Sequence, residues 1–160
     1  MVAIHSRSGV SSSLAGRVPA LVRLSTHLLP SVLRQQALSG GLNTAFNQPV
    51  HRGELDFMRG RCVRIRVSDI DLDFSVTLLG QRLFVSMNPV DPDVTFRAEL
   101  RDLLSVIAGQ TDPDTLFFRR RLAIEGNTEL GLALKNFLDS QDPEQLIPAP
   151  AYRLVTYLSA

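Results

Sequence analysis

The stretch Asp71-Leu-Asp-Phe-Ser-Val-Thr-Leu78 alternates strictly between polar and apolar side chains. Its apolar positions are Leu72, Phe74, Val76 and Leu78. A period of two residues is typical of a β-strand with one buried face and one hydrated face. The sequence therefore predicts a strand whose apolar side must be covered by other elements.

Further candidate strands surround this stretch, at 62–67, 83–87, 94–98 and 121–125, and the central strand itself runs over 71–79. We also expect residues 53–57 to form a strand that pairs with 62–67 as a hairpin. Apolar spacing predicts helices at 99–108 and 129–138, and Asp112 followed by proline predicts a short helix from there to residue 118. This order of elements indicates an α+β fold with helices on one face of the sheet.

Residues 14–46 carry apolar side chains at helical spacing. Pro30 is expected to begin a second helix, and the pair Gly40–Gly41 to end it. The basic residues lie mainly off the apolar stripe, and they are Arg17, Arg23, His27 and Arg34. A segment of this kind either packs on the core or binds a membrane surface, and both interpretations stay open.

The composition is that of one globular domain of 160 residues with a formal net charge of +1, which offers no overall field for nucleic acid. A single cysteine, Cys62, excludes an intramolecular disulfide and a cysteine-based metal site within one chain. A reduced thiol fits a cytoplasmic protein. Residues 1–13 are rich in serine and lack a continuous apolar run, so we expect a disordered or vector-derived start and no secretory signal.

No group of residues predicts catalysis, a metal or a cofactor. The three histidines, His5, His27 and His51, are far apart in the sequence and have no partner at ligand spacing. The aspartates at 69, 71 and 73 resemble the start of a calcium loop, but Phe74 and Gly80 stand where that loop needs glycine and glutamate. The sequence therefore predicts a protein that is not an enzyme.

One dense basic cluster follows two aromatic residues, Phe117 and Phe118, and consists of Arg119, Arg120 and Arg121. The cluster is either a solvated strand edge or a contact for anionic headgroups at a membrane surface.

The later helices carry apolar stripes that are expected to cover the apolar face of the sheet. If they interdigitate fully with the strands they form a core, and if they stand off they leave a tunnel for a lipid. Sequence pattern alone does not separate these outcomes. The residues expected to line a lipid site are Leu72, Phe74, Val76, Leu83, Val85, Leu103, Ile107, Phe117, Leu134 and Phe137.

The run Asp112-Pro-Asp-Thr-Leu-Phe-Phe-Arg-Arg-Arg-Leu-Ala-Ile-Glu-Gly-Asn-Thr-Glu-Leu-Gly-Leu-Ala-Leu-Lys-Asn-Phe-Leu-Asp139 resembles the signature of the UbiT family. The stretches 53–57 and 67–73 are similar to the same family, and the likeness extends over roughly 14–139. These are accessory factors of ubiquinone biosynthesis built on a sterol-carrier-protein type 2 domain.

The resemblance implies a five-stranded, largely antiparallel sheet roofed by helices around an apolar tunnel, over residues 47–139. It implies a role in oxygen-independent ubiquinone synthesis, with prenylated quinone precursors or phospholipid as cargo and iron–sulfur hydroxylases as partners. It carries no catalytic residue over to this chain. Residues 140–160 are expected to form a partly helical tail.

From these observations we predict a lipid-holding protein that associates peripherally with the membrane. Its contacts with bilayer or headgroups are predicted at Arg17, Arg23, Arg34, Arg119, Arg120 and Arg121. The alternative is a non-catalytic interaction module whose apolar N-terminal segment docks a biosynthetic partner or a second copy of the chain.

Overall fold

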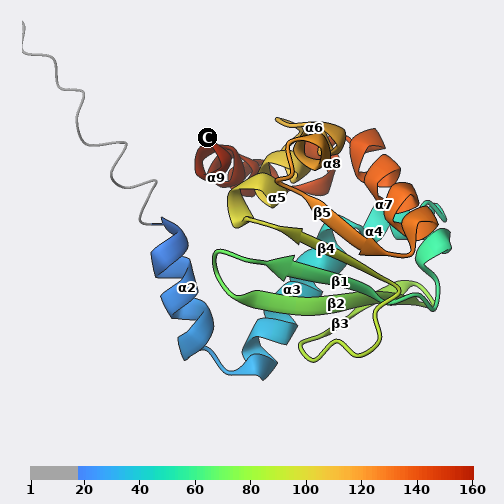
Figure 1. Ribbon diagram of the computed structural model, residues 1–160, viewed down its shortest axis with the longest axis horizontal. Helices are drawn as coiled ribbons and strands as arrows, with labels where there is room; N and C mark the ends of the chain where they lie inside the picture. Colours follow the sequence, from blue (N-terminus) through green and yellow to red (C-terminus); the bar gives the residue numbers. More distant parts are fainter. Residues whose placement is uncertain (1–17) are drawn as a thin grey trace, which may run out of the picture.

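The computed structural model describes residues 18–160. The predicted start at 1–13 and Arg17 lie outside this part of the chain. The fold is built on one five-stranded sheet with the order β3-β2-β1-β4-β5 (Figure 1). Its strands are β1 (Val63–Val67), β2 (Leu72–Leu79), β3 (Arg82–Ser86), β4 (Val94–Ala98) and β5 (Ala123–Gly126). All neighbours pair antiparallel except β1 and β4, which run parallel.

The alternation in β2 sets the two faces of the sheet. Phe74 lies beside Ile65 of β1, and Val76 lies between Val63 of β1 and Val85 of β3. Because side chains in register project from the same face of a sheet, these residues form one continuous apolar surface. The predicted α+β class is confirmed, with helices lying against this surface (Figure 1).

The expected strand at 53–57 is wrong. The chain turns at Gly53, where φ is 75°, and then forms the short 3₁₀ helix η1 (Asp56–Met58). Leu55 and Met58 are both buried, because the turn points them into the core. The alternation of polar and apolar residues in this segment resembles the period of a strand, but the segment forms a tight turn.

The later helices are α5 (Leu100–Ile107), α6 (Pro113–Phe118), α7 (Thr128–Ser140), α8 (Pro143–Leu146) and α9 (Ala149–Ser159). Asp112 caps α6 as predicted, accepting a hydrogen bond from the Asp114 amide at 3.0 Å. Asn127 caps α7 by accepting from the Leu130 amide at 3.0 Å. Local capping chemistry thus fixes where these helices begin.

The N-terminal part forms α2 (Val18–Leu28), α3 (Ser31–Ala45) and α4 (Asn47–His51). Pro30 immediately precedes α3, in agreement with the prediction. The expected break at Gly40–Gly41 is wrong, because α3 continues through both glycines. Contacts on both sides of the pair hold it: Gln35 donates to the Val85 carbonyl at 2.9 Å, and Asn43 donates to the Leu83 carbonyl at 2.8 Å.

The core lies between the apolar face of the sheet and α7, with α3 along the β3 side. The ring of Phe137 in α7 packs in a tilted arrangement against Phe46 and Phe57, with centroids 5.9 and 6.3 Å away. Gly131 brings α7 close to the sheet, since a Cβ there would lie 2.7 Å from Cγ2 of Ile124. Helix α2 stands apart from the sheet (Figure 1).

Candidate functional site

The residues predicted to line a lipid site are mostly core residues. Those in the buried cluster are Phe74, Val76, Leu83, Val85, Leu134 and Phe137. Leu72 and Leu103 are partly buried and pack against that cluster. Sheet and helices contact each other here, so these side chains fill the space that a lipid chain would need. A lipid site among them stays a prediction, and it requires the helices to move away from the sheet.

Two of the ten residues lie elsewhere. Ile107 lines a surface cleft of about 270 Å³, together with Pro113, Leu138 and Leu146. The cleft opens where α5, α6, α7 and α8 come together, and Pro143 closes one side of it against Gly109. Phe117 is 43% exposed and lies outside the core, so it does not contribute to an interior site.

A second cleft, of about 430 Å³, lies between α3 and β3. Its lining includes the polar residues Gln36, Ser39 and Arg82. Asn43 also lines this cleft, and its side-chain amide donates to the Leu83 carbonyl at 2.8 Å while its oxygen accepts from the Leu83 amide at 2.9 Å. These bonds occupy the free edge of the sheet, so α3 takes the place of a sixth strand. Sequence reasoning missed this role of Asn43.

Helix α2 presents an uncovered apolar surface. Its exposed apolar side chains, with those at the start of α3, are Leu21, Leu24, Leu28, Leu29, Val32 and Leu33. Arg23 pairs with Asp71 at 2.7 Å, in the turn between β1 and β2, and both side chains are largely exposed. His27 of α2 lies 3.7 Å from the same carboxylate, and exposed ion pairs of this kind contribute about 0–1 kcal/mol each.

The predicted membrane-contact arginines have different surroundings. Arg34 is half-buried, and its Nε is buried without a hydrogen-bond partner among the described residues. Arg119 and Arg120 are exposed, and within residues 18–160 their side chains form no hydrogen bond or ion pair.

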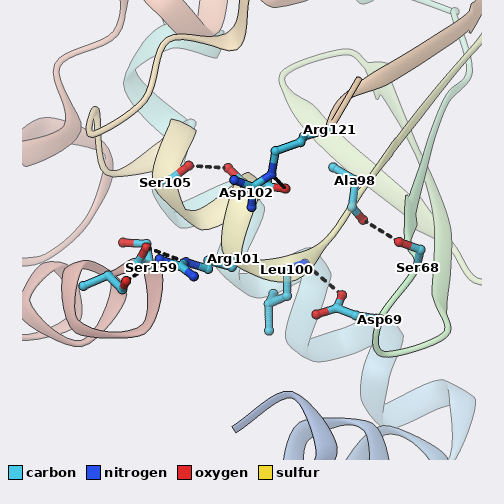
Figure 2. A network of polar contacts seen from close by, with 10 residues as sticks. Ser68, Asp69, Ala98, Leu100, Arg101, Asp102, Ser105, Arg121 and Ser159 are labelled. Carbon is cyan, nitrogen blue, oxygen red and sulfur yellow. Dashed lines mark hydrogen bonds and ion pairs between the residues drawn. The ribbon is translucent and has the colours of Figure 1, made fainter. Parts of the chain in front are cut away.

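Arg121 forms an ion pair with Asp102. Figure 2 shows it reaching from the segment after α6 to Asp102 on α5. Its Nε donates to Asp102 Oδ2 at 3.0 Å, and its Nη2 lies 2.6 Å from Oδ1. The Asp102 side chain is 5% exposed, so this bidentate contact compensates a buried charge. The Arg121 side chain is still 45% exposed, so its contact with a headgroup stays a prediction.

The sheet face opposite the core is mainly polar and partly exposed. Arg64 of β1 forms a bidentate pair with Asp73 of β2 at 2.8 and 2.6 Å. The hydrogen bond to Asp73 raises the pKa of Arg64 above its ordinary value. Arg97 and Glu125 pair across β4 and β5 at 3.7 Å, so cations and anions are matched on this face.

Residues 18–160 contain neither a candidate metal site nor a candidate membrane-spanning helix. No group of three or more His, Cys, Asp or Glu side chains is arranged there to hold a metal ion. None of the helices in this range is long and apolar enough to cross a membrane.

The sheet order, the roofing helices and the apolar face define a recognisable class of domain. The sequence model of the SCP-2 sterol transfer family matches residues 42–139. The solved structure described as "UbiJ-SCP2 Ubiquinone synthesis protein" resembles this fold with a TM-score of 0.59, over 69% of this chain and 93% of that one. Its sequence identity of 17% limits the likeness to the fold.

Closer relatives give the particular family. The "Ubiquinone biosynthesis accessory factor UbiT" of Escherichia coli strain K12 is 44% identical over 128 residues, which cover 80% of this chain and 73% of the relative. The protein of the same name from Escherichia coli O157:H7 matches to the same extent. The chain therefore belongs to the SCP-2 sterol transfer family and, within it, to the UbiT family.

Proposed function

We propose that the protein is an accessory factor of oxygen-independent ubiquinone biosynthesis that holds prenylated quinone precursors or other lipids and presents them to iron–sulfur hydroxylases at the membrane. The observation that carries the proposal is the 44% identity to UbiT of Escherichia coli over 80% of the chain. Membership of the SCP-2 sterol transfer family supports an apolar cargo. The protein performs no chemical step itself in this proposal.

The physical reason for such a factor is the insolubility of a prenyl tail. Each buried CH₂ group is worth about 0.8 kcal/mol relative to water, so a long tail stays almost entirely in the bilayer. Transfer from bilayer to protein exchanges one apolar medium for another and changes the free energy little. The protein therefore needs direct contact with the membrane, so that the tail never crosses water.

The exposed apolar side of α2 supports that contact. Leu21, Leu24 and Leu28 lie at helical spacing and are open to solvent, next to Arg23 on the polar side. An amphipathic helix of this kind lies in the plane of a bilayer, with its cations near anionic headgroups. The exposed pair between Arg23 and Asp71 is weak enough to exchange for a lipid phosphate.

Cargo uptake requires the core to open. Helix α7 covers the sheet with Leu134 and Phe137, and the aromatic contacts of Phe137 with Phe46 and Phe57 close the space beneath it. Displacement of α7 or α3 exposes the predicted lining residues to a lipid chain. We propose that contact with the membrane compensates the cost of this opening.

Two measurements test the proposal. Native mass spectrometry after mild extraction should detect co-purifying quinone precursor or phospholipid. A strain that lacks this protein should lose ubiquinone when grown without oxygen and regain it with the wild-type chain. Protein that is reproducibly empty and binds no added quinone contradicts the carrier role, and normal anoxic ubiquinone levels in the deletion strain contradict the pathway.

The close contacts of the core favour one second candidate, a scaffold that binds partner proteins without lipid. Here the apolar side of α2 docks a protein or a second copy of the chain. Size-exclusion chromatography with light scattering separates the two functions. Loss of an oligomer on replacing Leu21, Leu24 and Leu28 by serine, with bound lipid unchanged, favours the scaffold.

A further inference from the structure

The last two residues of α6 expose two adjacent aromatic rings on the surface. Phe118 is 79% exposed and Phe117 is 43% exposed, and their rings meet edge to face with centroids 5.8 Å apart. Single exposed apolar side chains are common on soluble proteins, whereas contiguous apolar surface is the usual mark of an interaction site. We refer to residues 117–120 as the Phe-Arg corner.

The Phe-Arg corner is held firmly by the residues on either side of it. Leu116 and Leu122 are buried, and the amides of Arg121 and Leu122 both donate to the Leu116 carbonyl, at 2.9 and 3.1 Å. The backbone turns sharply at Arg120, where φ is 58°, a conformation that side-chain-bearing residues seldom adopt. The aromatic rings are therefore presented by an ordered turn, which the bidentate pair of Arg121 with Asp102 anchors to α5.

The charge of the Phe-Arg corner is positive and uncompensated. The nearby carboxylates are already engaged, Asp102 by Arg121 and Asp114 by Lys135. Arg119 and Arg120 have no ion pair or side-chain hydrogen bond within the described residues. Two free guanidinium groups beside two phenyl rings match the boundary of a bilayer, where rings enter the acyl region and cations meet phosphates.

We propose that the Phe-Arg corner is a second membrane anchor, with Phe117 and Phe118 inserted into the bilayer and Arg119 and Arg120 bound to anionic phospholipid. The proposal rests on the proposed function for membrane contact and adds a site independent of α2. A protein partner fits the corner less well, because four residues are far fewer than the roughly 20–30 on each side of a stable interface.

The chain contains no tryptophan, so one introduced indole reports on one position. The test compares Phe118→Trp with Phe84→Trp, a matched control on the exposed polar face of the sheet, where Phe84 is 52% exposed. Each variant of the full chain is mixed with vesicles of phosphatidylglycerol and phosphatidylcholine whose acyl chains carry bromine. We expect a blue shift and strong quenching for Phe118→Trp, and neither for Phe84→Trp.

Vesicle sedimentation in the same samples separates this proposal from the proposed function. Protein that sediments while the tryptophan at 118 stays unquenched overturns the corner as an anchor and leaves membrane contact to α2. Absence of sedimentation overturns both. Equal quenching at 84 and 118 also overturns the proposal, because it indicates non-specific adsorption.

A second set of variants tests the two chemical parts of the Phe-Arg corner. Phe117→Ser with Phe118→Ser should weaken vesicle binding about tenfold, whereas Phe84→Ser should leave it unchanged. Arg119→Gln with Arg120→Gln should weaken binding to anionic vesicles by about 30-fold at low salt and remove the preference over neutral vesicles. Unfolding temperatures close to wild type confirm that the variants fold. Wild-type vesicle affinity in either double variant overturns the assignment.

Discussion

At the scale of single residues, three consecutive arginines have different roles. Arg121 compensates the buried carboxylate of Asp102, while Arg119 and Arg120 stay exposed and unpaired among the described residues. Their order in the sequence predicts a basic cluster but does not distinguish its members. The signal that was available is Asp102 itself, an acidic residue among the apolar positions of α5. A buried carboxylate needs a cationic partner, and Arg121 supplies it from 19 residues away.

Arg121→Gln should destabilise the protein more than Asp102→Asn. Removing the arginine leaves a carboxylate that is 5% exposed without a counter-ion, and breaking a buried pair in this way costs about 3–5 kcal/mol. Removing the carboxylate leaves an arginine that is 45% exposed and reaches water, at a cost of about 1–3 kcal/mol. Urea denaturation of both variants gives the two free energies. A larger loss for Asp102→Asn would contradict this account of the pair.

At the scale of elements, α3 and α7 are positioned by contacts that no local pattern specifies. Helix α3 crosses two glycines because Gln35 and Asn43 bond to the edge of β3, about 50 and 40 residues further along the chain. Helix α7 approaches the sheet where Gly131 leaves room for Ile124. Helix propensity near Gly40 favours a break by about 1 kcal/mol per glycine, and these bonds outweigh it.

Asn43→Ala should open the β3 edge. The substitution removes one donor and one acceptor from the outward-facing backbone of Leu83, and we expect a loss of about 1–3 kcal/mol. Hydrogen exchange of the Leu83 amide should accelerate. Thr44→Ala is the matched control, because Thr44 is exposed and its hydroxyl donates only within α3, to the Gly40 carbonyl. Unchanged protection of Leu83 in Asn43→Ala would refute the role of α3 as an edge cover.

Glycine-to-alanine substitutions in α7 and in α3 should change the stability of the protein in opposite directions. At Gly131 a Cβ would lie 2.7 Å from Ile124 Cγ2, so Gly131→Ala should cost about 1–3 kcal/mol. At Gly41 the space is open, so Gly41→Ala should stabilise by about 0.5–1 kcal/mol. Thermal unfolding measures both. Equal effects would show that close packing of α7 is not what selects glycine at 131.

At the scale of the whole molecule, a packed domain is joined to a helix that hardly contacts it. The core holds most of the predicted lipid-site residues in mutual contact, and α2 extends away with its apolar side open (Figure 1). This division is consistent with a carrier that is closed in water and opens at a membrane. The exposed side chains of α2 then contribute to membrane binding, whereas the buried core determines stability.

Replacing Leu21, Leu24 and Leu28 by serine should therefore weaken vesicle binding without destabilising the domain. These side chains are already exposed, so their loss should change the free energy of unfolding by less than about 0.5 kcal/mol per residue. Flotation with anionic liposomes and urea denaturation measure the two quantities. A large loss of stability would indicate that α2 packs on the domain in solution.

Sequence alone was enough to predict the five strands of the sheet, the cap at Asp112, and the family, through the run 112–139. These features depend on neighbours a few residues apart, which pattern and side-chain chemistry report directly. Long-range contacts decide that residues 53–57 turn, that α3 passes through its glycines, and that Arg121, itself 45% exposed, pairs with the buried Asp102 while its neighbours stay unpaired among residues 18–160. Each of those outcomes depends on a partner distant in the sequence, and the free energy of such a contact exists only once the chain has folded.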